Sequence, residues 1–451
     1  MLYYSTNLAA TQVSFRAALI KGLADDGGLY MPVEIPAMPW AEIAAMRNMD
    51  YPQIAFSVAM KFLADEIPAA DLKALVEDAY DYPVPLEQVR ERHHVMRLDQ
   101  GPTASFKDFA ARLMGRLMQY YLQRENRKLL ILTATSGDTG SAIANAFYGL
   151  DNIRVVVLYP ELEVTARQRK QMSTLGQNIE LISIDGKFDD CQALVKRAFT
   201  DPELAYLNLS SANSINIGRL IPQTMYYFYA YARLAERIGE EIVFSVPSGN
   251  FGDLMGGLIA KRMGLPVHRF VVATNSNDEF PIYCHTGVYK VISPSRNCIS
   301  SAMNVGHPSN VARLIALYGG RMDEKGVIHQ EADLDAIRRD LYAVSIGEDA
   351  TKATISEAWR QYRLLLEPHG AVGWAGLNDY LARHPEDHSR VCVSLETAHP
   401  AKFPEQIQQL LGFDPELPAS LLGLEEKQEF ILPLRHDYET FTRHLRKNYS
   451  A

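Results

Sequence analysis

The sequence predicts an α/β fold with a largely parallel sheet, because short apolar segments alternate with helical patterns from about residue 96 onward. The apolar segments are typical of strands, and helix-length connections between them favour parallel pairing. They span residues 129–133, 155–158, 179–184, 242–246, 270–273 and 391–395. Three of these segments, ending at residues 133, 246 and 395, run into loops rich in Gly, Ser, Thr, Asn or Asp. Ligands of open α/β sheets bind beyond the carboxyl ends of the strands, so we expect one ligand held by several loops.

Helical periodicity supports this alternation. A helix is expected after the first strand, with Ile143, Ala146 and Phe147 on one face and Gly149 just beyond its end. Another is expected before residue 207, with the apolar face Cys191, Leu194, Val195, Ala198 and Phe199. Residues 1–95 are expected to be mostly helical with proline-rich joints. They form a separate N-terminal region in this prediction.

Composition excludes several classes of protein. The 451 residues carry 45 Lys+Arg against 54 Asp+Glu, a net charge of −9, which argues against nucleic acid as a partner but permits a small basic pocket for an anionic metabolite. The chain shows neither a signal-peptide pattern nor an apolar run long enough to cross a bilayer. Its 4 cysteines lack metal-ligand or disulfide spacing. We therefore expect a cytoplasmic protein without a metal site or a membrane partner.

Lys107 is the first candidate for chemistry. The apolar spacing from Phe106 to Tyr121 predicts an amphipathic helix that begins near Lys107, with Thr103 or Ser105 as its N-cap. A helix N-terminus and bulky neighbours both disfavour the protonated amine, so this lysine is suited to forming a Schiff base or moving a proton. A surface lysine whose charge is offset by Asp108 explains the segment about equally well.

Two glycine-containing loops follow predicted strands. Residues 248–253 (Ser-Gly-Asn-Phe-Gly-Asp) could direct backbone N–H groups and a helix N-terminus at a phosphate, although a plain strand-to-helix turn remains possible. Residues 135–140 (Thr-Ser-Gly-Asp-Thr-Gly) suit a carboxylate or phosphate. Helix capping by Asp138 or Ser136 explains this second loop almost as well.

Two further segments carry clustered polar residues. Residues 213–219 (Asn-Ser-Ile-Asn-Ile-Gly-Arg) combine several donors with an arginine that matches a dianion, or simply cap a helix starting at Leu220. After the last strand, Thr397, His399 and Lys402 could each meet a ligand, although His399 alone is better explained as a histidine satisfied within a turn. One imine-forming lysine, one phosphate cradle and one strand-end threonine suggest pyridoxal phosphate. A second oxyanion set suggests a phosphorylated or carboxylated substrate.

In combination, these motifs resemble those of the threonine synthase family. The ordered set is Gly101-Pro-Thr-Ala-Ser-Phe-Lys-Asp-Phe109, Thr135-Ser-Gly-Asp-Thr-Gly140, Asn213-Ser-Ile-Asn-Ile-Gly-Arg219, Ser248-Gly-Asn-Phe-Gly-Asp253 and Thr397-Ala-His-Pro-Ala-Lys-Phe403. Tyr4-Ser-Thr6 and Asp26-Gly-Gly-Leu-Tyr-Met-Pro32 resemble the N-terminal segment of the family. The likeness extends from the first residues to about residue 410.

The resemblance implies a fold type II pyridoxal-phosphate enzyme, similar to the tryptophan synthase β subunit: a two-domain α/β core with an additional, mostly helical N-terminal domain. We expect the N-terminal domain at 1–95, the large cofactor-binding domain at 96–125 and 236–451, and the smaller α/β domain at 126–235. Lys107 would be the catalytic residue and bind the cofactor covalently. The other implied cofactor-binding residues are Gly249, Asn250, Phe251, Gly252 and Asp253 near the phosphate and Thr397 at the pyridine nitrogen. The implied substrate-binding residues are Thr135, Ser136, Gly137, Asp138 and Thr139 for the carboxylate, and Asn213, Ser214 and Arg219 for the phosphate.

The implied reaction converts O-phospho-L-homoserine and water to L-threonine and phosphate. Lys107 would move protons while phosphate leaves Cγ and water adds at Cβ. A related lyase that releases 2-oxobutyrate remains an alternative, as does a non-catalytic protein that binds pyridoxal phosphate; a serine or threonine dehydratase would not need residues 213–219. The chain departs from the family pattern at Asp99-Gln100, Asn304 and His307. A monomer and a homodimer are both compatible with the sequence.

Overall fold

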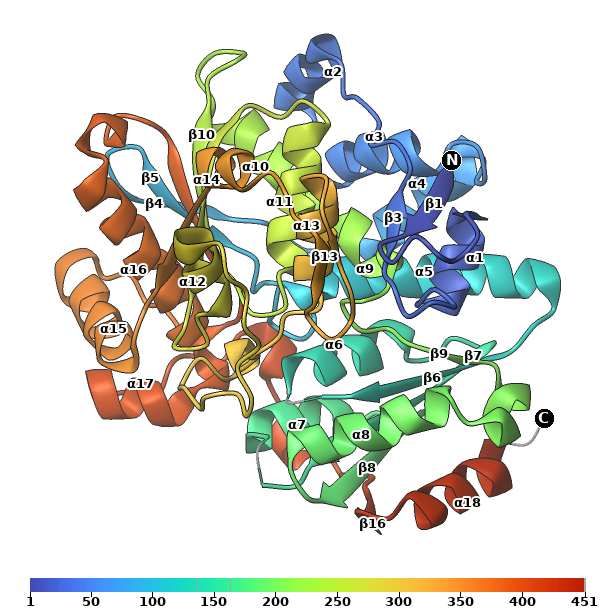
Figure 1. Ribbon diagram of the computed structural model, residues 1–451. Coiled ribbons are helices and arrows are strands. Elements are labelled where there is room, and N and C mark those ends of the chain that lie inside the picture. Colours follow the sequence, from blue (N-terminus) through green and yellow to red (C-terminus); the bar gives the residue numbers. More distant parts are fainter. Residues whose placement is uncertain (136, 163, 450–451) are drawn as a thin grey trace.

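Two β-sheets organise the chain in the computed structural model, which describes residues 1–135, 137–162 and 164–449 (Figure 1). The larger sheet has six strands in the order β14-β11-β10-β15-β5-β4, all parallel except β4. These are β14 (Leu341–Ser345), β11 (Val267–Thr274), β10 (Ile242–Pro247), β15 (Cys392–Glu396), β5 (His93–Arg97) and β4 (Leu86–Arg90). The smaller sheet is wholly parallel, in the order β16-β8-β7-β6-β9. Its strands are β16 (Leu432–Arg435), β8 (Ile179–Asp185), β7 (Ile153–Pro160), β6 (Leu129–Ala134) and β9 (Leu209–Ser210).

The predicted α/β fold is confirmed, and each apolar segment identified in the sequence forms a strand in one of the two sheets. The reason is burial on both faces. In β6, Leu129 and Ile131 belong to one core cluster, while Leu130 and Leu132 belong to another on the opposite face. Strands buried on both sides by crossover helices appear in the sequence as continuous apolar runs.

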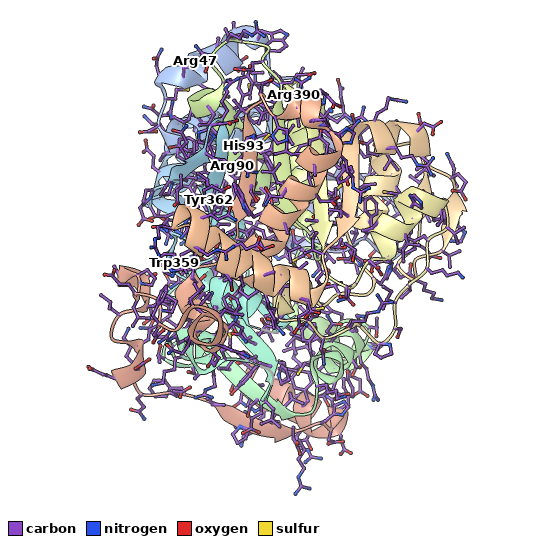
Figure 2. The ribbon with its side chains drawn as sticks, turned by 90° about the vertical axis from the view of Figure 1, so that its left-hand side faces the viewer. Arg47, Arg90, His93, Trp359, Tyr362 and Arg390 are labelled. Atoms are coloured by element: carbon purple, nitrogen blue, oxygen red, sulfur yellow. The ribbon has the colours of Figure 1, made fainter. Side chains whose placement is uncertain are left out.

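Helices cover both sheets. The larger sheet packs against α16 (Pro368–Arg383), which contacts β10, β11 and β15 and is itself covered by α15 (Glu348–Tyr362). At the β4 edge, Arg90 donates to the Tyr362 hydroxyl (3.1 Å) and to Asn378 Oδ1 (2.7 Å), which ties the edge strand to these helices (Figure 2). Helices α11 (Gly252–Arg262), α12 (Glu279–Thr286) and α14 (Leu334–Asp340) also contact strands of this sheet. Further helices pack mainly on other elements: α5 (Lys107–Glu125), α9 (Ile217–Leu220), α10 (Met225–Leu234), α13 (Val311–Leu317) and α17 (Pro404–Leu411). Helices α6 (Asp138–Phe147), α7 (Ala166–Ser173) and α8 (Phe188–Phe199) flank the smaller sheet.

The N-terminal region contains more β structure than expected. Helices α1 (Phe15–Lys21), α2 (Trp40–Ala45), α3 (Tyr51–Leu63) and α4 (Ala69–Ala79) accompany a small antiparallel sheet. Its strands are β1 (Leu2–Ser5), β2 (Val13–Ser14) and β3 (Tyr30–Pro32). The expected boundary at residue 95 falls inside β5, which pairs with β15 of the larger sheet. We therefore propose that the larger domain begins near β4.

The C-terminal segment returns to the smaller sheet. Strand β16 pairs with β8, and α18 (Tyr438–Tyr449) packs on α8. Phe441 and Leu445 are fully buried in the same core cluster as Leu130 and Cys191. This burial explains why residues 432–449, expected in the large domain, lie with the smaller one.

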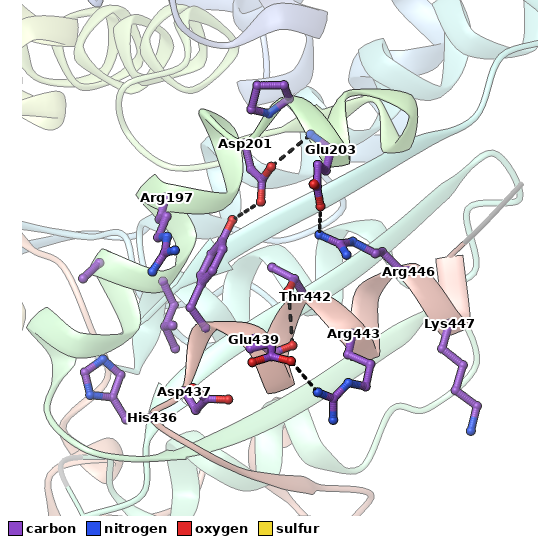
Figure 3. Close-up of a pocket in the computed structure, with 14 residues that line it drawn as sticks. Arg197, Asp201, Glu203, His436, Asp437, Glu439, Thr442, Arg443, Arg446 and Lys447 are labelled. Carbon is purple, nitrogen blue, oxygen red and sulfur yellow. Dashed lines mark hydrogen bonds and ion pairs between the residues drawn. The ribbon is translucent and has the colours of Figure 1, made fainter.

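A groove of about 1340 Å³ lies between α8 and α18 (Figure 3). The charged side chains on its walls engage one another: the Tyr438 hydroxyl donates to Asp201 (2.7 Å), and Arg443 pairs with Glu439 (2.8 Å). None of the candidate site residues lines this groove. The groove is formed where α18 packs against α8.

No helix of the described residues is both long enough and apolar enough to span a membrane.

Substituting Phe441→Ala should weaken the docking of α18 by about 3–5 kcal/mol, because a fully buried ring is lost. Hydrogen exchange followed by mass spectrometry should show faster exchange in α18 and β16. The exposed Arg443→Ala substitution on the same helix serves as the control and should change exchange little. Unchanged protection in the Phe441 variant would contradict this account of the C-terminal segment.

Candidate active site

Lys107 is the first residue of α5 and lies beside the loop that follows β15. The Phe106 N–H donates to the Thr397 carbonyl (2.9 Å), and Ser105 forms a β-bridge with Ala398. The segment before Lys107 is thus held against the strand end that carries Thr397. The helix N-cap is Phe106, without a capping side chain, so the predicted cap at Thr103 or Ser105 is wrong.

Asp108 does not offset the charge of Lys107. The buried Asp108 carboxylate accepts hydrogen bonds from the Thr103 N–H (2.8 Å) and hydroxyl (2.6 Å), so the Thr103 hydroxyl is directed at Asp108. Lys107 is partly exposed, but Asp108 is engaged by Thr103, so the interpretation that Asp108 offsets the lysine charge is wrong. Burial lowers the pKa of Lys107; nearby Asp138 opposes this, while Lys402 and Arg219 lower the pKa further. A lysine in these surroundings loses its proton more readily than one in water.

A buried ion pair lies next to Lys107. Lys402 Nζ is 2.7 Å from Asp138 Oδ1 and also donates to the Thr103 carbonyl (2.8 Å). Gln168 donates a second hydrogen bond to Asp138 (2.9 Å). Burial alone would raise the pKa of Asp138, but the charges of Lys402 and Lys107 outweigh it and hold that pKa far below its ordinary value.

Hydrogen bonds within the predicted carboxylate-binding loop determine its conformation. The Thr135 hydroxyl accepts the N–H groups of Gly137 (3.0 Å) and Gly140 (2.8 Å). Gly137, not Asp138, is the N-cap of α6, so capping by Asp138 is wrong. Gly137 has φ 136°, and a Cβ there would lie 2.6 Å from Gln168, so this position requires glycine. Thr139 is partly exposed in the first turn of α6, and Ser136 lies outside the described residues.

The glycine-containing loop after β10 has the geometry of a phosphate cradle. Phe251 adopts a left-handed conformation (φ 63°) as the N-cap of α11, and its ring packs edge-on against Phe280. The exposed Asn250 receives a hydrogen bond on its carbonyl from Asn310 Nδ2 (2.9 Å). A Cβ on Gly249 would lie 2.9 Å from Met303 Cα. The loop therefore brings backbone N–H groups and a helix N-terminus together where side chains are excluded, as a phosphate requires.

Asp253 lies just inside this helix, beneath the cradle. The hydroxyls of Tyr226 (2.6 Å) and Tyr227 (2.7 Å) both donate to its Oδ1, while its buried Oδ2 has no hydrogen-bond partner among the described residues. Burial raises the pKa of Asp253 to about 6, although the two hydroxyls and the charge of Lys107 act in the opposite direction.

Arg219 is buried beside this region and has unused donor capacity. Its Nη1 donates to the Ala212 carbonyl (2.8 Å), while its Nε has no partner among the described residues. Burial lowers the pKa of Arg219 to about 10, so it stays charged at neutral pH. Asn216 caps α9 at Ile217, so the helix begins earlier than expected, and Asn213 accepts from the Thr133 hydroxyl (2.6 Å). Ser214 is partly exposed in the same loop.

A carboxyl cluster behind Thr397 was not found from the sequence. Glu367 caps α16 by accepting the N–H groups of His369 (2.8 Å) and Gly370 (2.9 Å), and His369 Nδ1 lies 2.5 Å from the same carboxylate. Burial and the charge of Glu367 hold the pKa of Glu396 well above its ordinary value. The Glu-Pro-His-Gly sequence at residues 367–370 is a helix-start signal that could have indicated the cap, but not its proximity to β15.

His399 and the residues that depart from the family pattern bond to groups in their own or neighbouring loops. His399 Nδ1 accepts the Ala401 N–H (3.2 Å), which confirms the interpretation of a histidine satisfied in a turn. Among the departures from the family pattern, Asn304 bonds Asn275 and Cys298, and His307 lies between Tyr289 and Glu324. Gln100 donates to Asp99. No group of three or more metal-ligating side chains occurs in the described part of the chain.

The residues present fit pyridoxal phosphate. An amine with a lowered pKa, a helix N-terminal cradle and a strand-end hydroxyl lie on loops that meet around Lys107. A family model described as pyridoxal-phosphate dependent enzyme matches residues 82–396, so the fold and site define an enzyme of this class. Models described as threonine synthase N terminus and threonine synthase, C-terminal match residues 2–80 and 370–444.

Similar proteins identify the family more closely. The threonine synthase of Escherichia coli is 40% identical over 411 residues, covering 91% of each chain, and that of Haemophilus influenzae is 40% identical over 422 residues, covering 93% of this chain and 94% of its own. The structure of pyridoxal-phosphate-bound threonine synthase from Brucella melitensis matches all of both chains with a TM-score of 0.93 at 37% identity. Yeast threonine synthase matches with a TM-score of 0.90 at 30% identity, covering 99% of this chain and 98% of its own. The chain belongs to the threonine synthase family.

Substituting Gly249→Ala should weaken the binding of pyridoxal phosphate to the apoprotein by about tenfold or more, because the new Cβ displaces the backbone of Met303. Fluorescence titration with the cofactor would measure this. Gly347→Ala is the control, because no atom lies within 4 Å of a Cβ at that position. Equal affinities in the two variants would exclude residues 249–252 as the phosphate cradle.

Substituting Lys402→Met should raise the pKa of Lys107, because it removes a cation that lowers this pKa and leaves Asp138 facing Lys107 without its partner. Only the neutral amine attacks an aldehyde, so the rate at which Lys107 couples to pyridoxal phosphate should reach its plateau at higher pH. Absorbance after rapid mixing with the apoprotein would measure the profile.

The partly exposed Lys352→Met substitution is the control for the Lys402 variant. The double variant Lys402→Met with Asp138→Asn removes both charges and should shift the profile less. An unshifted profile in Lys402→Met would contradict the electrostatic account of Lys107.

Proposed function

We propose that the protein converts O-phospho-L-homoserine and water to L-threonine and phosphate. The observation that supports this proposal is that a glycine-containing loop at a helix N-terminus and a buried arginine with an unpartnered Nε both lie near Lys107, whose pKa is lowered by burial. The loop at 249–252 suits the cofactor phosphate, and the buried, incompletely bonded Arg219 suits a second phosphate. An enzyme acting on an amino acid without a phosphate would not need the second set.

In this proposal each group of residues has a defined task. Gly249, Asn250, Phe251 and Gly252 bind the cofactor phosphate, with Asp253 beneath them, and Thr397 faces the pyridine nitrogen. Bound pyridoxal phosphate supplies an electron sink that makes the substrate Cα–H bond acidic. Asn213, Ser214 and Arg219 bind the substrate phosphate, and the loop at 135–139 binds its carboxylate.

Lys107 handles protons in the reaction. Its Nζ is proposed to accept the Cα proton of the substrate and later to return a proton to the product. Burial lowers the pKa of Lys107, which keeps the amine available as a base, and Asp138 and Lys402 fix the surrounding charge. The Arg219 guanidinium stabilises the phosphate as it leaves Cγ.

We further infer a cytoplasmic enzyme, active as a monomer or homodimer, that acts on a small molecule and does not bind nucleic acid as its main task. The four described cysteines are free thiols, two of them buried, which suits a reducing compartment. The net charge of −9 supports the exclusion of nucleic acid.

The loaded protein incubated with O-phospho-L-homoserine should form threonine and phosphate in a one-to-one ratio. Lys107→Ala should reduce turnover by about 10³-fold or more, because it removes both the covalent anchor and the base. The exposed Lys128→Ala substitution should leave the rate unchanged. Phosphate accompanied by 2-oxobutyrate would establish the lyase alternative instead, and full activity in Lys107→Ala would exclude the lysine assignment.

A further inference from the structure

Arg313 is a fully buried cation without a carboxylate partner among the described residues. It lies in the first turn of α13, a helix that Figure 1 shows near the middle of the view. Burial lowers the pKa of Arg313 to about 9, so the guanidinium is still protonated at neutral pH. Burying an unpaired charge costs free energy, so we expect this arginine either to bind a counter-ion or to have a function.

The donors of Arg313 converge on the loop at 213–219. Nη1 donates to the Ser214 carbonyl (3.1 Å) and Nη2 to the Ile215 carbonyl (2.6 Å). Nε donates to the Tyr30 carbonyl of β3 (3.1 Å), which fixes the guanidinium from the opposite side. Arg313 therefore sets the position of the peptide groups that follow Asn213.

Asn310 extends this contact to the cofactor cradle. Its Oδ1 accepts from Arg313 Nη1 (2.7 Å), and its Nδ2 donates to the Asn250 carbonyl (2.9 Å) and more weakly to the Ser214 carbonyl (3.4 Å). Two side chains one helical turn apart thus connect both phosphate-binding loops. Arg219 and Arg313 are two buried guanidinium groups that contact the same loop, and neither forms an ion pair with a described carboxylate.

We propose that Arg313 is a positioning residue for the substrate-phosphate loop, whose charge strengthens the binding of a dianion at residues 213–219. This inference rests on the proposed function. Hydrogen bonds from a cation to the Ser214 and Ile215 carbonyls polarise those peptide groups, so their N–H groups, which belong to Ile215 and Asn216, become stronger donors. The Asn216 N–H already donates to the Asn213 carbonyl (3.0 Å), so the Ile215 N–H is the one proposed to bind the phosphate. A bound phosphate dianion supplies the counter-charge that the protein lacks.

The test compares the binding of inorganic phosphate and of L-threonine to the cofactor-loaded protein. Threonine lacks a phosphate, so it reports on the rest of the site. In Arg313→Gln, the dissociation constant of inorganic phosphate should rise about tenfold while that of threonine stays within about twofold. Arg313→Lys keeps the charge but not the planar fork, and should lie between the Gln variant and the unaltered protein. With O-phospho-L-homoserine, KM should rise in the same order with a smaller change in kcat.

Arg112→Gln is the matched control, because Arg112 is also buried and donates to backbone carbonyls, at Ala79 and Asp78. It should leave both dissociation constants unchanged. If the dissociation constants of phosphate and threonine rise by the same factor in Arg313→Gln, or if that of phosphate is unaltered, the proposal is wrong. If Arg313→Gln does not fold, the Arg313→Lys variant serves as the test: weaker binding of phosphate with unchanged binding of threonine supports the proposal, and unchanged binding of both contradicts it. The binding of inorganic phosphate is measured without turnover, so the two proposals can fail separately. If the substrate assignment is wrong, no threonine forms from O-phospho-L-homoserine, but Arg313→Gln still weakens phosphate binding.

Discussion

The buried ion pair between Asp138 and Lys402 is the interaction on which the arrangement of the site depends. Asp138 follows β6 of the smaller sheet, whereas Lys402 follows β15 of the larger sheet. Lys402 also holds the Thr103 carbonyl ahead of Lys107. One contact therefore joins the two sheets at their carboxyl ends and sets the electrostatic surroundings of the reactive amine. Removing either partner would leave a buried charge uncompensated, which is among the more costly changes available to a folded protein.

The distribution of charge explains how an acidic chain can bind anions. The net charge is −9, yet Lys107, Arg219 and Arg313 are concentrated around the site. Lys402 has a buried carboxylate partner, Asp138, whereas Arg219 and Arg313 form no ion pair with a described carboxylate. The arginines bond to backbone carbonyls instead, so their charge is left for a ligand to neutralise. In the proposed function a substrate phosphate supplies this counter-charge, and unlike a protein carboxylate it arrives and leaves with the reaction.

The sequence predicted what depends on local pattern and missed what depends on distant contacts. Strands β6, β7, β8, β10, β11 and β15 are continuous apolar runs, and each was expected. By contrast, β4 and β16 lie at sheet edges and are only partly buried, so their composition gave little signal. The five motifs marked the loops that meet at Lys107. The contacts of Arg313 could not be predicted, because its hydrogen bond to Tyr30 spans 283 positions in the chain. The contacts of Asp138 with Gln168 and with Lys402 could not be predicted either, because they depend on how distant segments pack.

The carboxyl cluster at the end of β15 bears on the choice of Thr397 as the proposed partner of the pyridine nitrogen. Glu396 directly precedes Thr397, and its pKa is held well above the ordinary range by burial and by the charge of Glu367. Glu396 therefore holds its proton more tightly than an ordinary carboxyl does, and the Glu367 carboxylate accepts the Gly370 N–H at the start of α16 and lies 2.5 Å from His369 Nδ1. The Thr397 hydroxyl carries no charge, so as a partner it would not stabilise a protonated ring nitrogen as a carboxylate would. In the proposed arrangement the site gives a weaker electron sink, and Lys107 and Arg219 are the cations that would assist the departure of phosphate.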